Sequence, residues 1–255
     1  MTRRLTDIIC VFRIHLARLR REAGPFVLAA VVFPLVMYMF ATAVGATGDA
    51  GSVHDPSQRV RFLAGSIVFS LSLTAVSWLG YLLLENRFTG RLKLFATLPL
   101  APSSYILGIV VFALAQAAIG TVVLVAIARA FGVRTALSLP VGGLLLGAVL
   151  VLTVLCVCGI GVIIAARARS FSEGSLLTDA LGAGLVFLAP IYCAPEALPR
   201  PLQILSKALP TTYAARGVQT TLLGGTGVAT ELLALTVMAA ATLAVGFRVM
   251  RWRED

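Results

Sequence analysis

Long apolar runs separated by short polar segments make up most of the 255-residue chain. An α-helix needs about 20 predominantly apolar residues to cross the hydrocarbon core of a bilayer. Six runs have this character, although the fifth is short, and they span residues 26–44, 62–84, 105–128, 141–166, 176–189 and 232–247. The pattern predicts an all-α, polytopic membrane protein with six transmembrane helices, folded as a single transmembrane domain over residues 1–255.

A basic segment with apolar residues at helical spacing precedes the first run. Its apolar positions are Leu5, Ile8, Ile9, Phe12, Leu16 and Leu19. Six arginines lie between residues 3 and 21, and Gly24-Pro25 ends the segment. A basic amphipathic helix of this kind lies in the plane of the membrane interface. We therefore predict an N-terminal amphipathic interfacial helix over residues 1–24. A soluble cytosolic helix is the alternative.

A second amphipathic pattern lies between the second and third runs. Its apolar residues share one helical face; they are Leu84, Phe88, Leu92 and Phe95. The charged residues lie mostly off that face; they are Glu85, Arg87, Arg91 and Lys93. Pro99 ends the pattern, so we predict a short cytosolic helix over residues 85–99. The alternative is a solvated loop whose arginines only set the topology.

Residues 188–225 hold five of the eleven prolines of the chain among many apolar residues. These prolines are Pro190, Pro195, Pro199, Pro201 and Pro210. Non-helical backbone at membrane depth is tolerated only where protein or a cavity surrounds it. We interpret residues 190–225 as a re-entrant helical hairpin, in which Pro195 and Pro199 start one short helix and Pro210 separates it from the next. A plain extracellular loop is the alternative.

The distribution of Lys and Arg orients the predicted spans. If both termini are cytoplasmic, fourteen of these residues lie on the cytoplasmic side and seven on the outer side. Because cytoplasmic loops carry the excess of positive charge, this orientation is the predicted one, with the hairpin on the outer side. The net charge of +10 then reflects topology and anionic membrane lipids, not nucleic acid. A cleavable signal peptide ending at Ala41-Thr42-Ala43 is disfavoured, because its basic and apolar regions are too long.

Residues that would support catalysis or metal binding are scarce. Neither Lys93 nor Lys207 lies in a Gly-x-x-x-x-Gly-Lys-Ser/Thr phosphate loop, and the two histidines lie near segment ends. The four cysteines form no metal-binding pattern. We therefore expect no catalytic, cofactor-binding or metal site in this chain, and no enzyme activity of its own.

Few polar residues lie inside the predicted spans. Asp179 is the candidate for an ion or proton route, unless it points back to the cytosolic interface. Gln116 is a candidate for a hydrogen bond between helices. Gly143 and Gly147 form a small-xxx-small pair, which permits close approach of two helices.

Three elements of the sequence together resemble a known family. The first is the basic amphipathic segment before the first span. The second runs from Glu85-Asn86-Arg87 through Gly90-Arg91-Leu92 to Leu98-Pro99-Leu100. The third precedes the last span and contains Pro190, Pro195, Leu198-Pro199, Leu202, Leu205, Leu209-Pro210, Thr212-Tyr213 and Arg216. Because these three elements have the order and spacing found in that family, the chain resembles the permease subunits of type-2 ABC exporters over essentially its whole length.

The sequence departs from the family pattern at two places. The family often has Glu-Arg where this chain has Glu85-Asn86-Arg87, and Asn-Pro where it has Leu209-Pro210. The subfamily therefore stays open.

The resemblance implies a division of labour between chains. A separate ABC ATP-binding subunit, present in two copies per complex, would bind ATP and Mg, and this chain would bind neither. A second permease half, identical or paralogous, would complete the membrane part. The complex would lie in the cytoplasmic membrane of a bacterium, with membrane lipids around it and no nucleic acid bound.

The resemblance also implies roles for particular residues. The residues that couple to the ATPase would be Glu85, Arg87, Phe88, Gly90, Arg91, Lys93, Arg167 and Arg169. The outer gate in the hairpin would be formed by Pro190, Pro195, Pro199, Pro210, Tyr213 and Arg216. The wall of the substrate path would be built from Phe33, Met37, Phe40, Phe69, Leu73 and Phe187.

The predicted function is therefore ATP-driven export of a hydrophobic or amphipathic substrate, such as a drug, a natural product or a lipid-like molecule. Charged residues suited to a hydrophilic substrate are absent from the predicted spans. Export of a lipid-linked glycan is an alternative. A non-transport scaffold or sensor subunit, and a proton-coupled carrier that uses Asp179, are alternatives of other classes.

Overall fold

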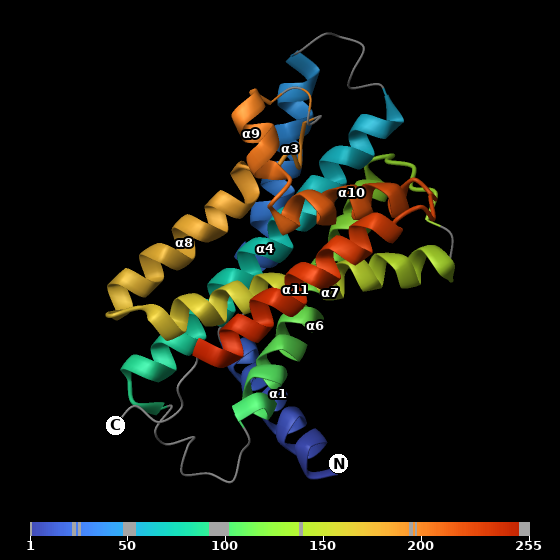
Figure 1. The fold of residues 1–255 in the computed structure, drawn as a ribbon. Coiled ribbons are helices and arrows are strands. Elements are labelled where there is room, and N and C mark those ends of the chain that lie inside the picture. The colour runs from blue at the N-terminus through green and yellow to red at the C-terminus, as the bar shows by residue number, and fades with distance from the viewer. Residues whose placement is uncertain are drawn as a thin grey trace.

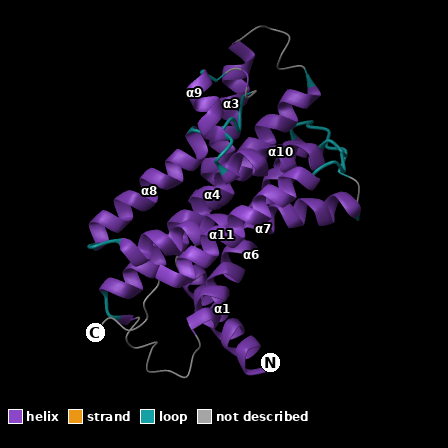
Figure 2. Ribbon diagram, viewed as in Figure 1, coloured by secondary structure: helices purple, strands orange, loops and turns teal. Residues whose placement is uncertain are grey.

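The computed structural model describes residues 2–21, 24, 27–47, 55–91, 102–137, 140–193, 196 and 198–249. Over these residues every regular element is a helix and no strand occurs (Figure 2). The long helical elements are α1 (Thr2–Arg21), α3 (Phe33–Thr47), α4 (Pro56–Phe88), α6 (Pro102–Ala130), α7 (Val141–Arg167), α8 (Phe171–Phe187) and α11 (Ala229–Val249). Three shorter ones are the π-helix η1 (Leu28–Val32), α9 (Arg200–Ser206) and α10 (Pro210–Leu222). The all-α prediction is confirmed for this part of the chain.

Four of the helices are long and apolar enough to cross a membrane. They are Pro56–Phe88, Ser104–Ala130, Val141–Arg167 and Ala229–Val249, which match the second, third, fourth and sixth predicted spans. The first predicted span is divided between η1 and α3, and α3 contributes a shorter apolar segment, Phe33–Ala43. The fifth corresponds to α8, which has 17 residues. The protein is thus a multi-pass membrane protein whose described residues include four helices long enough to span a membrane, and the predicted count of six is not confirmed.

Helix α4 lies at the centre of the bundle and packs on α3, α6, α7, α8 and α10 (Figure 1). Within its apolar window 88% of the residues are buried, against 17% for α11 at the periphery. Small residues along α4 let neighbouring helices come close. The hydroxyls of Ser66 and Thr74 donate to the carbonyl oxygens of Phe62 and Ser70, respectively, one turn earlier. These polar hydroxyls therefore have hydrogen-bond partners inside the core.

Glycines mark three close contacts between helices. A Cβ added at Gly80 of α4 would lie 2.9 Å from Thr178 of α8, and one added at Gly159 of α7 would lie 2.5 Å from Thr242 of α11. At Gly108 of α6 it would lie 2.6 Å from Val11 of α1. The predicted pair at Gly143 and Gly147 is not used in this way, because an added Cβ at Gly147 meets no atom within 4 Å.

Helix α1 packs along α6. Val11 and His15 are buried, and the Phe12 ring lies 6.1 Å from that of Phe112, centroid to centroid. The predicted helix is present, and Phe12 of the predicted apolar face contacts the bundle, but the buried residues Val11 and His15 lie outside that face. Leu5 and Ile9 of that face stay exposed, so they are available to the membrane interface.

The proline-rich segment contains the two short helices that were predicted. Pro199 immediately precedes α9, and Pro210 is the first residue of α10. Helix α10 is buried and packs on α4, α7 and α11. A plain loop is therefore excluded for this part of the segment. The re-entrant position of the hairpin in the membrane remains a prediction.

Candidate functional site

The end of α4 and the link between α7 and α8 come together at one end of the bundle (Figure 1). We call residues 85–91 and 167–173 the α4–α7 junction. They contain seven of the eight residues that were predicted to couple to the ATPase. Lys93 and the rest of the predicted helix over residues 85–99 lie outside the described residues.

The predicted helix does not begin at Glu85. Residues Glu85, Arg87 and Phe88 instead form the last turn of α4, which ends at Phe88. Gly90 follows with a φ of +74°, a left-handed conformation that glycine adopts at little cost after a helix. The boundary differs from the prediction because the polar residues Glu85, Asn86 and Arg87 do not end the helix of the span, which runs on to Phe88.

Arg87 points into the protein. Its Nη1 donates to the carbonyl oxygens of Ala165, Ala166 and Ala168, at 2.9, 3.2 and 2.9 Å. These carbonyls belong to the C-terminal end of α7, where the last turn of a helix leaves its acceptors unpaired and the dipole is negative. Arg87 therefore caps α7 and ties it to α4.

Glu85 and Arg91 form an ion pair at the surface of the junction. The Arg91 Nη1 lies 3.0 Å from the Glu85 Oε1, and the side chains are 55% and 31% exposed, respectively. Phe88 is also exposed. This surface thus offers an aromatic ring and charges of both signs to a partner.

The link between α7 and α8 is held in shape by a capping box. The Ser170 Oγ accepts a hydrogen bond from the backbone N–H of Glu173, and the Glu173 Oε2 accepts one from the backbone N–H of Arg169. Such reciprocal bonds fix the first turn of a helix. Arg167, Arg169 and Phe171 are exposed around it.

Asn86 is a residue of the junction that sequence reasoning missed. It is 4% exposed, and its Nδ2 donates to the hydroxyl of Tyr105, at the start of α6. Asn86 is one of the positions where the sequence departs from the Glu-Arg pattern. That departure was a signal of a changed environment, but it does not identify the partner, which is 19 residues away.

Comparison of the sequence with protein families gives a family that covers most of the chain. A family model described as ABC-2 type transporter matches residues 8–223, most of the chain. The chain belongs to the ABC-2 type transporter family. A search of curated proteins found no match. As an ABC-2 membrane protein, the chain is a permease subunit, and its family implies an ABC ATP-binding partner.

In this ABC-2 permease, the residues predicted for the outer gate are distributed over the proline-rich segment. Pro190 and Pro210 are buried, whereas Pro199 and Arg216 are exposed. Tyr213 is half-buried and its hydroxyl donates to the carbonyl oxygen of Lys207. Pro195 lies outside the described residues. The hydroxyl of Thr211 donates to the carbonyl oxygen of Leu185, which fastens α10 to the end of α8.

The residues predicted for the substrate path do not gather at one place in the ABC-2 permease. Phe69, Met37 and Leu73 belong to the packed core. Phe33, Phe40 and Phe187 are exposed on the surface of the described chain. The sequence showed that these side chains are apolar. It did not show which of them pack in the core and which lie on a surface that a second subunit or lipid covers.

The polar residues predicted inside the spans have different surroundings. Asp179 is exposed on α8, and its Oδ2 accepts a hydrogen bond of 2.6 Å from the Tyr81 hydroxyl. A proton route in a membrane protein needs an ionisable group that faces the bundle interior, so this position does not favour the carrier alternative. Gln116 is 2% exposed, and its side chain has no hydrogen-bond partner among the described residues.

Proposed function

We propose that this chain is the membrane-spanning half of an ATP-driven exporter, and that the α4–α7 junction docks its separate ATP-binding subunit. The observation that carries the proposal is the Arg87 cap. It makes the end of α4 and the link before α8 one rigid unit. A force applied to the exposed residues of the junction would then reach both helices together.

The proposed complex contains two permease halves, identical or paralogous, and two ATP-binding subunits that bind ATP and Mg. It lies in the cytoplasmic membrane of a bacterium with both termini in the cytoplasm. The excess of Lys and Arg on that side supports this orientation. ATP binding closes the ATP-binding subunits, pushes on the junctions and opens a path to the outside.

The proposed substrate is hydrophobic or amphipathic. The helices that cross the membrane have apolar interiors whose buried polar groups are mostly hydroxyls bonded to their own helix. Such an interior offers no charged group to replace the hydration of a hydrophilic substrate. A drug, natural product or lipid-like molecule fits this chemistry better than a free sugar or an ion.

The docking proposal is tested with two exposed charges of the junction. Arg91→Glu and Arg169→Glu together should weaken co-purification of the ATP-binding subunit by about tenfold, because rim charges are converted to repulsive ones. The rate of substrate-stimulated ATP hydrolysis should fall together with the co-purification. Arg200→Glu changes the same charge at the exposed start of α9 and is the matched control.

Unchanged co-purification in the double variant would contradict docking at this surface. Transport by the chain in the absence of any ATP-binding subunit would contradict the exporter itself. Normal docking without transport of any tested substrate would favour a scaffold or sensor subunit.

A further inference from the structure

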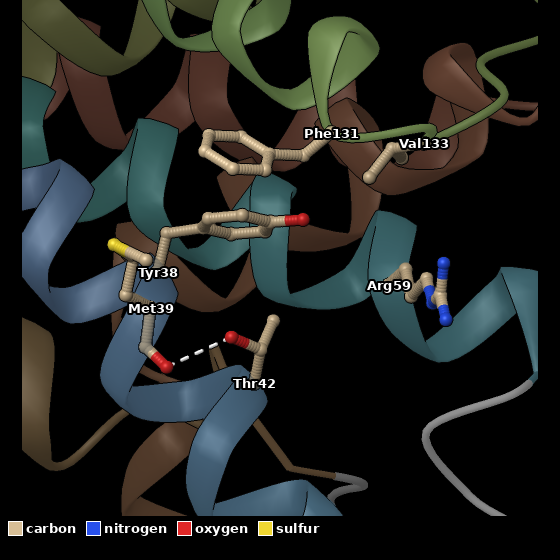
Figure 3. A pocket seen from close by; sticks show the side chains of 6 residues that line it. All are labelled: Tyr38, Met39, Thr42, Arg59, Phe131 and Val133. Atoms are coloured by element: carbon tan, nitrogen blue, oxygen red, sulfur yellow. Dashed lines mark hydrogen bonds between the residues drawn. The ribbon is translucent and has the colours of Figure 1, made fainter.

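Two adjoining pockets lie where α3 ends, α4 begins and α6 ends. The first has a volume of about 240 Å³ and is lined by Tyr38, Met39, Thr42, Arg59, Phe131 and Val133 (Figure 3). The second has a volume of about 230 Å³ and is lined by Pro56, Arg59, Gly132, Val133 and Arg134. Because Arg59 and Val133 line both, the pockets share a wall.

The lining combines an apolar side with a cationic side. In Figure 3 the side chains of Tyr38, Met39 and Phe131 lie on one side of the pocket and Arg59 lies on the other. Met39 is 53% and Phe131 is 63% exposed, so the apolar side is open to a ligand. Arg134 adds a second guanidinium to the cationic side.

Asp55 is the acidic residue immediately before α4. Its carboxylate caps α4 by accepting hydrogen bonds from the backbone N–H and the hydroxyl of Ser57. These bonds, and to a lesser degree the charge of Arg61, hold the pKa of Asp55 below its usual value. The carboxylate thus stabilises the first turn of α4.

Size and position indicate the kind of ligand. Pockets for drug-sized molecules have volumes of roughly 300–1,000 Å³, and each of these is smaller. They lie at the ends of two spans, Pro56–Phe88 and Ser104–Ala130. Lipid headgroups lie at the ends of transmembrane helices, where apolar side chains give way to arginines.

We propose that these pockets bind an anionic phospholipid of the adjacent leaflet. Arg59 and Arg134 contact its phosphate, because the planar guanidinium matches phosphate oxygens in two-point hydrogen bonds. Tyr38, Met39 and Phe131 contact the glycerol and the upper part of the acyl chains. This site does not depend on the transported substrate or on the docking of the ATP-binding subunit.

The test measures lipid binding to the purified full-length chain by native mass spectrometry. The chain is titrated with phosphatidylglycerol and with phosphatidylcholine of the same acyl chains. We expect tighter binding of phosphatidylglycerol. Arg59→Gln with Arg134→Gln should weaken it roughly thirtyfold and remove the preference, since each basic residue near an anionic lipid contributes about a fivefold change. Arg61→Gln is the matched control, because it removes the same charge from α4 but lines neither pocket.

Two further measurements keep the result interpretable. Arg134→Gln alone changes an exposed residue outside any helix, so it should fold normally and still weaken binding. Phe131→Ala should weaken the binding of phosphatidylglycerol, and it should not strengthen the binding of phosphatidylcholine. Equal binding of the two lipids, or an equal loss in Arg61→Gln, would overturn the proposal. Displacement of the lipid by soluble glycerol phosphate would also overturn it, because the apolar side would then contribute nothing.

Discussion

The side chain of Arg87 stabilises the contact between α4 and α7, because its partners are the otherwise unpaired carbonyls at the end of α7. Three acceptors at the end of α7 share its Nη1. The ion pair of Glu85 with Arg91 lies only a few residues away, but it is exposed to solvent. Water competes for exposed charges and weakens their interaction. Of the two arginines, Arg87 is therefore the structural one and Arg91 is the one free to change partners.

The first prediction follows from this difference. Arg87→Met should lower the free energy of unfolding by about 1–3 kcal/mol, because charge-assisted hydrogen bonds are lost and carbonyls are left unpaired. Arg91→Met should lower it by about 1 kcal/mol or less. Denaturant unfolding of the purified chain measures both. Equal losses in the two variants would contradict the assigned roles.

A second prediction at this scale concerns Asp55. Its pKa is lowered by its bonds to Ser57, so the cap stabilises the start of α4 above the ordinary carboxyl pKa. As the pH falls below about 4 and through the lowered pKa, protonation removes that contribution. Hydrogen exchange at residues 57–60 should accelerate relative to its intrinsic rate over this range. Asp55→Asn still accepts a hydrogen bond but does not titrate, so it should show no such pH dependence.

At the scale of the elements, glycines decide how closely helices approach. Helix α7 carries several, yet only some of them face a neighbour. Gly159 lies against Thr242 of α11, and Gly161 lies against Leu79 of α4. Gly147 faces open space in the described chain. A small-xxx-small pattern in the sequence permits close approach but does not specify which face of the helix meets a partner.

The third prediction compares two of these glycines. Gly159→Ala should destabilise the chain by about 1–3 kcal/mol, because the new Cβ overlaps both the side chain and the backbone of Thr242. Gly147→Ala should be neutral or stabilising by up to about 1 kcal/mol, because alanine favours the helix. Unfolding free energies of the two variants give the comparison. A costly Gly147→Ala would mean that another subunit packs there.

Local signals in the sequence predicted elements well. Pro199 and Pro210 mark the starts of α9 and α10, because proline fits the first turn of a helix and disrupts its interior. The boundary at Glu85 was wrong, because the polar residues that follow Leu84 continue the helix of the span instead of ending it. The partners of Arg87 and Asn86 were not predicted, because side chains meet across the fold at separations that periodicity does not encode.

At the scale of the whole molecule, α1 and α9 lie at opposite ends of the bundle (Figure 1). In the proposed orientation, which the excess of positive charge supports, the end with α1 lies in the cytoplasm. The apolar runs predicted the four full-length spans correctly. They did not settle the first and fifth, because a short or interrupted helix depends on its neighbours to remain in the membrane.

The fourth prediction tests this orientation with the natural cysteines. Cys10 on α1 is exposed and Cys193 after α8 is half-buried, whereas Cys156 and Cys158 are buried in α7. In intact cells a membrane-impermeant maleimide should label Cys193 but not Cys10. Cys10 should react only after permeabilisation, and the two buried cysteines should stay unlabelled. Versions of the chain with one cysteine each assign the signals, and the reverse pattern would contradict the orientation.

The Arg87 cap also has a consequence for biosynthesis. Its acceptors lie 78, 79 and 81 residues farther along the chain. At about 5–20 residues per second, a ribosome needs about 4–16 s to produce them after it has made Arg87. During that interval the guanidinium at the end of α4 must be hydrated or held by the insertion machinery. The junction is thus completed only when α7 has been inserted, which makes translation through the end of α7 a sensitive step in assembly.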